Sequence, residues 1–274
     1  MIEYQTFPKV SSNDTWHFIA GNGFPPAAYK RLFDKLPAAI QSPLLRPLWS
    51  KQQEPLLPSW QMFVSDLEQY ILKFKPKVVF GHSIGASLWV LAAQQFNYQF
   101  EKVMLIEPVV FPSWYVPLYE ILKWFNIHRR VHPMIPKTLK RQRWFQSKEA
   151  IVDRFSKKPL FSKVSEDVLI EFINASFKPH NNGFELIYSP EWEALVYDKM
   201  TLSINAIWDS LSAIKTPVLL LKAEYSDVIT NAVYKKLLKN YQHLTINVVK
   251  NTTHLLPFEQ PNYVVDELCA FTNA

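Results

Sequence analysis

Glycine is scarce in this sequence. Only 5 of its 274 residues are glycine. Glycine adopts left-handed backbone angles and lets two backbones approach closely, so a chain with few glycines has few positions that offer either property. Four of the five glycines stand in two short segments, as Gly21 and Gly23 and as Gly81 and Gly85. We therefore expect special backbone geometry in these two segments.

Cysteine and long apolar runs are also lacking. The single cysteine, Cys269, cannot form an internal disulfide and gives no metal-binding spacing, which favours a reducing compartment. No uninterrupted apolar run reaches the about 18 residues of a membrane-spanning helix. The first residues, MIEYQTFPKV, lack the charged start and apolar stretch of a secretory signal. We therefore expect a soluble, cytoplasmic protein.

The chain contains enough hydrophobic residues to form a core. Hydrophobic residues make up 48% of it, aromatic residues 15% and charged residues 20%, which excludes intrinsic disorder. The length corresponds to one large domain or to one domain with an insertion. A net charge of +6 gives a mild preference for anionic partners.

Short strand patterns alternate with helical patterns in the first and last thirds of the chain. Strands are predicted at residues 15–20, 43–49, 77–80, 102–106, 217–221 and 245–249. Helices are predicted at residues 26–39, 60–74, 84–96, 231–238 and 261–271. This alternation is typical of the α/β class, in which helices flank a mostly parallel sheet.

The middle of the chain has a different pattern. Between residues 109 and 215 strand patterns disappear, and amphipathic helices are predicted at residues 116–125, 149–155, 166–177 and 204–214. Such a stretch is too long for a loop in a compact domain. We predict a helical cap over residues 109–215, inserted into a body formed by residues 1–108 and 216–274.

Residues 81–85 read GHSIG and match the pattern G-x-S-x-G. They lie between a predicted strand and a predicted helix, where a sharp turn would project the hydroxyl of Ser83 from the sheet edge. Side chains at positions 81 and 85 would collide with the backbone of so tight a turn. The pattern therefore predicts that Ser83 is a nucleophile. The alternative is a serine that caps a helix, and His82 is interpreted as a packing and hydrogen-bonding residue.

With this motif the chain resembles the α/β-hydrolase superfamily over residues 15–108 and 216–273. The family's chain order of nucleophile, acid and base implies two further roles. Asp227, in KAEYSD, is similar to the family's acid, and His254, in NTTHLLPFEQP, is similar to its base. Glu107, at the end of a predicted strand, stands where some members carry the acid and is the alternative to Asp227.

The resemblance implies a serine hydrolase of fold type α/β with a helical cap. His254 would take the proton of Ser83, and Asp227 would orient the imidazole. The oxyanion would be held by the backbone N–H groups of Ile84 and Asn22. The chain departs from the family in having Ala20 where a histidine is usual, so the loop that carries Asn22 needs support from elsewhere.

The substrate implied by the resemblance is a hydrophobic ester or thioester, and no metal or organic cofactor is needed. Five aromatic residues are candidates for the wall of an apolar pocket, with core packing as the alternative for each: Phe24, Trp49, Trp114, Tyr115 and Trp124. The same fold also supports lyases, acyl transferases and peroxidase-like enzymes, and a non-catalytic binding protein is a further alternative.

Residues 123–148 contain eight Lys or Arg and no Asp or Glu, interleaved with aromatic residues. An anionic membrane surface and a phosphate-bearing substrate such as an acyl-CoA are the two functional interpretations. Solvated helix faces are the simpler interpretation and the one we favour, since no glycine loop that could hold a phosphate accompanies the charges. The helical spacing of the aromatic residues argues against nucleic-acid binding.

Overall fold

A computed structural model of the chain describes residues 2–46 and 59–273, and its centre is a mostly parallel sheet. The described strands of this sheet are β1 (Tyr4–Phe7), β2 (Thr15–Ile19), β3 (Ala39–Pro43), β4 (Val78–His82), β5 (Lys102–Ile106), β9 (Val218–Ala223) and β10 (Leu244–Val249). Their order across the sheet is β1-β3-β2-β4-β5-β9-β10, and only β1, at one edge, is antiparallel to its neighbour. The predicted fold class is confirmed.

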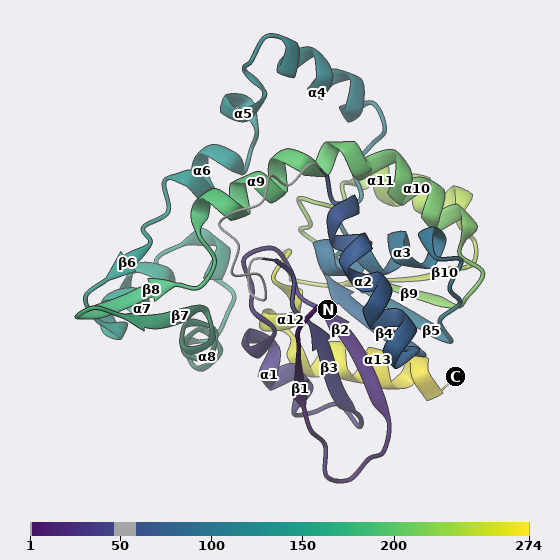
Figure 1. Cartoon of the computed structure of the whole chain (residues 1–274), viewed down its shortest axis with the longest axis horizontal. Coiled ribbons are helices and arrows are strands. Elements are labelled where there is room, and N and C mark those ends of the chain that lie inside the picture. Colours follow the sequence, from purple (N-terminus) through teal and green to yellow (C-terminus); the bar gives the residue numbers. More distant parts are fainter. Residues whose placement is uncertain (1, 47–58, 274) are drawn as a thin grey trace.

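Helices cover both faces of the sheet (Figure 1). Alternate residues of one strand pack into different layers, so Leu219 and Leu221 belong to one apolar cluster and Leu220 to the other. One layer contains α2 (Gln61–Phe74), α3 (Ile84–Gln95), α10 (Ile204–Ala213) and α11 (Asn231–Asn240). The other contains η1 (Pro26–Tyr29), α1 (Lys30–Phe33), α12 (Leu256–Glu259) and α13 (Pro261–Asn273).

The segment between β5 and β9 holds the predicted cap. Its described helices before α10 are α4 (Tyr115–Trp124), α5 (His128–Val131), α6 (Ile135–Leu139), α7 (Lys148–Ser156), η2 (Pro159–Phe161), α8 (Glu166–Ser176), α9 (Pro190–Met200) and η3 (Thr201–Ser203). Figure 1 shows α4 and α5 projecting from the rest of the molecule. The division into body and cap stays a prediction, and α10 packs against α3 of the body.

The structure differs from the predicted elements in four places. A small antiparallel sheet, formed by β6 (Trp144–Phe145), β7 (Phe177–His180) and β8 (Gly183–Leu186), stands where only helices were predicted. Its strands are too short for an alternating pattern to appear. The predicted helix at 26–39 ends at Phe33, and the predicted strand at 43–49 is β3, at Ala39–Pro43. The edge strand β1 was not predicted. None of the described helices is long and apolar enough to cross a membrane.

Candidate active site

Ser83 stands on a sharp turn between β4 and α3, as the glycine pattern predicts. Its backbone has φ 57° and ψ −123°, a conformation that non-glycine residues rarely adopt. A Cβ atom on Gly81 would lie 2.6 Å from the backbone N of Ala86, and one on Gly85 would overlap the carbonyl of Ile19. Glycine is therefore required at both positions to let the turn pack against β2 and α3.

Ser83 and His254 are in hydrogen-bond contact. The Oγ of Ser83 lies 2.9 Å from Nε2 of His254, and Nδ1 of the same ring lies 3.1 Å from Oε2 of Glu107. The three side chains come from the turn after β4, the loop after β10 and the end of β5. An imidazole placed between a hydroxyl and a carboxylate can accept the hydroxyl proton while the carboxylate stabilises the resulting charge. This is the geometry of an activated serine nucleophile.

Glu107 is held rigidly. It follows β5 with φ 49°, and its side chain is fully buried. Oε1 accepts a hydrogen bond from the backbone N–H of Ala223 at 2.7 Å, and Oε2 accepts one from the hydroxyl of Ser226 at 2.7 Å. With His254 as a further partner, the carboxylate has its position fixed by groups from two other segments of the chain.

This arrangement corrects the prediction that Asp227 is the orienting acid. Asp227 lies exposed on the turn after β9, and the carboxylate that contacts His254 is that of Glu107. The turn does belong to the site, because Ser226 in it and Ala223, the last residue of β9, donate to Glu107. It supplies donors to the acid, and the acid itself comes from the neighbouring strand β5.

A second set of hydrogen bonds links the loop before η1 to His254. The backbone N–H of Gly21 donates to the Tyr29 hydroxyl at 3.2 Å, and that hydroxyl lies 2.7 Å from Nδ1 of His82. Nε2 of His82 lies 2.8 Å from the carbonyl O of His254. A carbonyl can only accept, so Nε2 carries the hydrogen and Nδ1 accepts from Tyr29. Burial, and then the neighbouring His254, hold the pKa of His82 well below its ordinary value, so the ring stays neutral.

The segment Gly21–Gly23 is also held by α9. The side-chain amide of Asn22 donates to the carbonyl O of Glu193 at 3.1 Å. Gly23 has φ 79°, and a Cβ atom on it would lie 2.5 Å from the Glu193 carboxylate. Tyr29 and Glu193 thus support the loop in which Ala20 replaces the histidine usual in the family.

Glu193 forms a buried ion pair with Arg141. Nη1 of Arg141 lies 2.6 and 2.8 Å from the two carboxylate oxygens, and the Glu193 side chain is only 2% exposed. Burial raises the pKa of Glu193 to about 7, and Arg141 limits the rise. Sequence reasoning missed Glu193, because no helix was predicted at the position of α9 and a single glutamate carries no mark of its burial. Arg141 had been counted only among the basic residues of the 123–148 segment.

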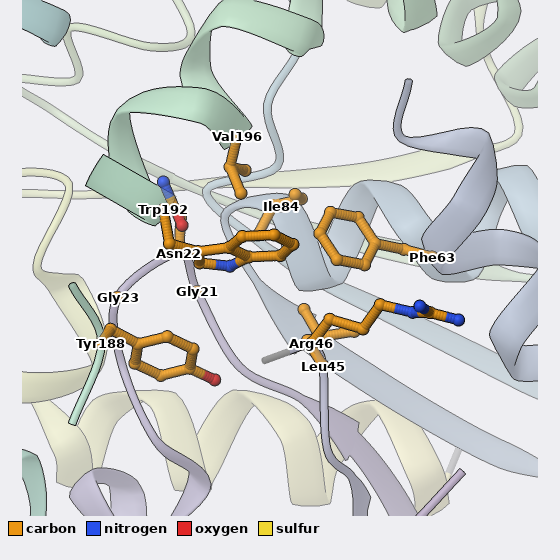
Figure 2. A pocket seen from close by; sticks show the side chains of 10 residues that line it. All are labelled: Gly21, Asn22, Gly23, Leu45, Arg46, Phe63, Ile84, Tyr188, Trp192 and Val196. Carbon is orange, nitrogen blue, oxygen red and sulfur yellow. The ribbon is translucent and has the colours of Figure 1, made fainter. Parts of the chain in front are cut away.

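Asn22 and Ile84, the predicted oxyanion-hole residues, line the same hollow (Figure 2). Trp192 from α9 and Phe63 from α2 meet edge-on across it, with ring centroids 6.2 Å apart. The remaining lining comes from Gly21, Gly23, Leu45, Arg46, Tyr188 and Val196. Most of this surface is apolar. It stays a prediction that the backbone N–H groups of Asn22 and Ile84 donate to the oxyanion. Their position in the lining of one hollow supports this prediction.

The predicted aromatic pocket wall requires correction. Trp114 is 63% exposed and Trp124 is 83% exposed, because α4 turns a different face toward the protein. Phe24 packs against Phe172 and Phe258, with ring centroids 5.2 and 5.4 Å away. Tyr115, the first residue of α4, is half-buried, and Trp49 lies outside the described residues. In the part of the chain that the structure describes, none of these aromatics lines the hollow at Ile84.

A mostly parallel sheet with a serine on the sharp turn after a central strand, and a histidine on the loop after the last strand, defines the α/β-hydrolase class of proteins. The sequence matches the model of the alpha/beta hydrolase family over residues 16–267. The chain belongs to this family.

Several solved structures have a similar fold. E-2-(acetamidomethylene)succinate hydrolase has a TM-score of 0.76 and 15% identity, and the match covers 100% of this chain and 95% of that one. A peroxisomal alpha/beta-hydrolase from Saccharomyces cerevisiae has a TM-score of 0.74 and 15% identity, covering 100% and 88%. An esterase from Mycobacterium tuberculosis has a TM-score of 0.70 and 14% identity, covering 100% and 92%. No curated protein sequence matches the chain.

Proposed function

We propose that the protein is a serine hydrolase that cleaves a carboxylic ester or thioester of a hydrophobic small molecule through an acyl-enzyme on Ser83. The observation that carries the proposal is the continuous contact from Ser83 through His254 to Glu107, at 2.9 and 3.1 Å. Family membership supports hydrolysis, and the names of two structural neighbours, a hydrolase and an esterase, agree with it.

The proposed reaction proceeds in two halves. Ser83 Oγ attacks the substrate carbonyl carbon while His254 Nε2 takes the hydroxyl proton, and Glu107 stabilises the imidazolium. The N–H groups of Asn22 and Ile84 receive the oxyanion. His254 then gives its proton to the leaving alcohol or thiol as the ester or thioester bond breaks. Water, activated by His254 in the same way, attacks the acyl-enzyme, releases the acid and restores Ser83.

The hydrophobic substrate class is inferred from the hollow beside Ile84. Leu45, Phe63, Trp192 and Val196 provide apolar contacts there. The guanidinium of Arg46 is engaged by Asp66, with Nε–Oδ2 at 2.7 Å and Nη2–Oδ1 at 2.8 Å. Because the charge of Arg46 is already paired with Asp66, it does not favour an anionic group of the substrate. An apolar acyl or alcohol group of the substrate suits this lining.

Hydrolysis of 4-nitrophenyl esters and acyl thioesters of increasing chain length tests the proposal. We expect turnover by the wild type and a loss of at least about 10³-fold in Ser83→Ala, because removing a triad member leaves only the residual catalysis of the oxyanion hole and binding. Ser156→Ala changes an exposed serine on α7 and is the matched control. Equal turnover by wild type and Ser83→Ala would refute the proposal, as would inactivity of the wild type on every ester and thioester.

A further inference from the structure

The segment 114–131, which we name the arm, contains α4 and α5 and projects from the molecule (Figure 1). An unusual number of its large apolar side chains are exposed: Trp114, Leu118, Ile121, Trp124, Phe125, Ile127 and Val131. Soluble proteins rarely expose contiguous apolar surface of this kind unless it binds something. The exposed apolar side chains therefore indicate that the arm binds a partner.

Four of the exposed residues form one stripe on α4, and Trp124 borders it. Trp114, Leu118, Ile121 and Phe125 follow one another at intervals of four, three and four residues, which places them on one face of a helix. Tyr119 lies on the opposite face and is buried, and its hydroxyl donates to Asp198 at 2.7 Å. This contact with α9 fixes the rotation of α4. The stripe consequently faces away from the protein.

Basic side chains accompany the stripe. Lys123, Arg129 and Arg130 are exposed on the arm, and its single acidic residue, Glu120, lies 3.9 Å from Lys123 Nζ. Within residues 2–46 and 59–273, Arg129 and Arg130 form no ion pair or side-chain hydrogen bond that would neutralise them. Their charges are thus available to an anionic partner.

We propose that the arm docks on the surface of an anionic lipid bilayer. The apolar stripe would lie in the interfacial region, where tryptophan is favoured because its ring is largely apolar and carries one polar N–H. Arg129 and Arg130 would contact lipid phosphates. An amphipathic helix with apolar residues on one side and cations beside them lies in the plane of such a surface.

Charge favours a bilayer over a second copy of this chain. In a symmetric dimer the same patch meets itself, so the three cations Lys123, Arg129 and Arg130 would meet a patch with the same three cations and one carboxylate, that of Glu120. Like charges in contact oppose such an interface. An anionic bilayer instead attracts all of them at once. This inference rests on the arm alone and does not depend on the proposed hydrolase activity.

Sedimentation of the full chain with vesicles tests the inference. One set of vesicles contains phosphatidylcholine and the other also contains phosphatidylserine. We expect binding to the anionic vesicles that weakens at high salt, because salt screens the attraction. The double variant Arg129→Gln and Arg130→Gln should bind about 25-fold more weakly, at about fivefold for each charge. Trp124→Ser should reduce binding about tenfold or more, through lost apolar burial.

Matched controls lie outside the arm. Lys235→Gln with Lys239→Gln removes two exposed charges from α11, and Leu72→Ser removes an exposed apolar side chain from α2. Both should bind like the wild type, and circular dichroism melting curves check that every variant is folded. Equal sedimentation with neutral and anionic vesicles would overturn the inference. So would a dimer in analytical ultracentrifugation that Trp124→Ser dissociates, without any vesicle binding.

Discussion

Glu107 Oε2 lies 3.1 Å from His254 Nδ1, so the carboxylate that faces the histidine comes from the end of β5. β5 lies beside β9 in the sheet, and the backbone N–H of Glu107 donates to the carbonyl O of Leu221 at 2.9 Å. This register brings Glu107 under the turn that follows β9. The Glu107 side chain can therefore reach His254, which is the histidine that an acid on that turn would also contact.

Exchanging the two candidate carboxylates for amides separates their roles. We expect Glu107→Gln to lower kcat on the order of 10⁴-fold, because an amide no longer stabilises the imidazolium or selects the right tautomer. Asp227→Asn changes an exposed side chain and should stay within about twofold of the wild type, as surface substitutions do. Steady-state kinetics on one ester measures both variants. A large loss in Asp227→Asn alone would show that the carboxylate at His254 is not the working acid.

Tyr29 should act as a positioning residue. Tyr29→Phe removes the hydroxyl that joins Gly21 to His82, which leaves two buried polar groups unpaired and should cost about 1–3 kcal/mol of stability. We also expect kcat to fall about tenfold or more with KM unchanged, because small misplacements at the site are costly.

Tyr70→Phe is the matched control for Tyr29→Phe. The Tyr70 hydroxyl is buried and bonds His17 and Gln41, away from the site. This variant should lose similar stability and keep its kcat. Equal kcat losses in the two variants would mean that the Tyr29 hydroxyl supports only the fold. Urea unfolding and ester kinetics on the same preparations give both quantities.

The Arg141–Glu193 pair should matter more for stability than an exposed pair. Arg141→Met leaves the Glu193 carboxylate buried without its hydrogen-bonded ion-pair partner, at a cost of about 3 kcal/mol. The half-exposed Arg143 pairs with Glu185 at 2.7 Å, so Arg143→Met is the control and should cost at most about 1 kcal/mol.

The cost of Arg141→Met should also depend on pH. Burial already raises the pKa of Glu193, and loss of Arg141 raises it further. A group with a raised folded-state pKa stabilises the protein at low pH and loses that contribution as the pH rises. Relative to the wild type, Arg141→Met should therefore be most destabilised near pH 8 and less so near pH 5. Urea unfolding at the two pH values measures this difference, and a cost that grows on acidification would contradict it.

Buried histidines should make the wild type less stable in acid. Burial lowers the pKa of His17 and of His132 to about 4, and that of His82 lies well below its ordinary value. Below the ordinary pKa of about 6.5 the unfolded chain binds protons that the folded chain does not. His17 and His132 should therefore each remove about 1.4 kcal/mol of stability per pH unit between pH 6.5 and 4, and His82 acts in the same direction.

Replacing one of these histidines isolates its contribution. His17→Gln should make the loss of stability on acidification shallower by about 1.4 kcal/mol per pH unit over the same range. The raised pKa of Glu193 acts in the opposite direction in both proteins and cancels in the comparison. Urea unfolding at a series of pH values checks the difference in slope. Parallel curves for wild type and variant would show that His17 is protonated equally in both states.

Features fixed by local sequence were predictable, and features fixed by contacts distant in the chain were not. The turn at Ser83 follows from two glycines and the adjoining strand and helix, and His254 follows from its place after the last strand. The choice between Glu107 and Asp227 depends on how β5 and β9 align, which no local pattern specifies. The exposure of Trp124 depends on the rotation of α4, which Tyr119 sets through its contact with Asp198.

Labelling with a fluorophosphonate probe, followed by peptide mass spectrometry, tests the activation of Ser83 most directly. Such probes phosphonylate a serine whose hydroxyl is activated by a neighbouring base. The account predicts one adduct per chain on the peptide that contains Ser83, no adduct in Ser83→Ala, and much slower labelling in Glu107→Gln. An unlabelled wild type, or an adduct on another serine that persists in Ser83→Ala, would contradict it.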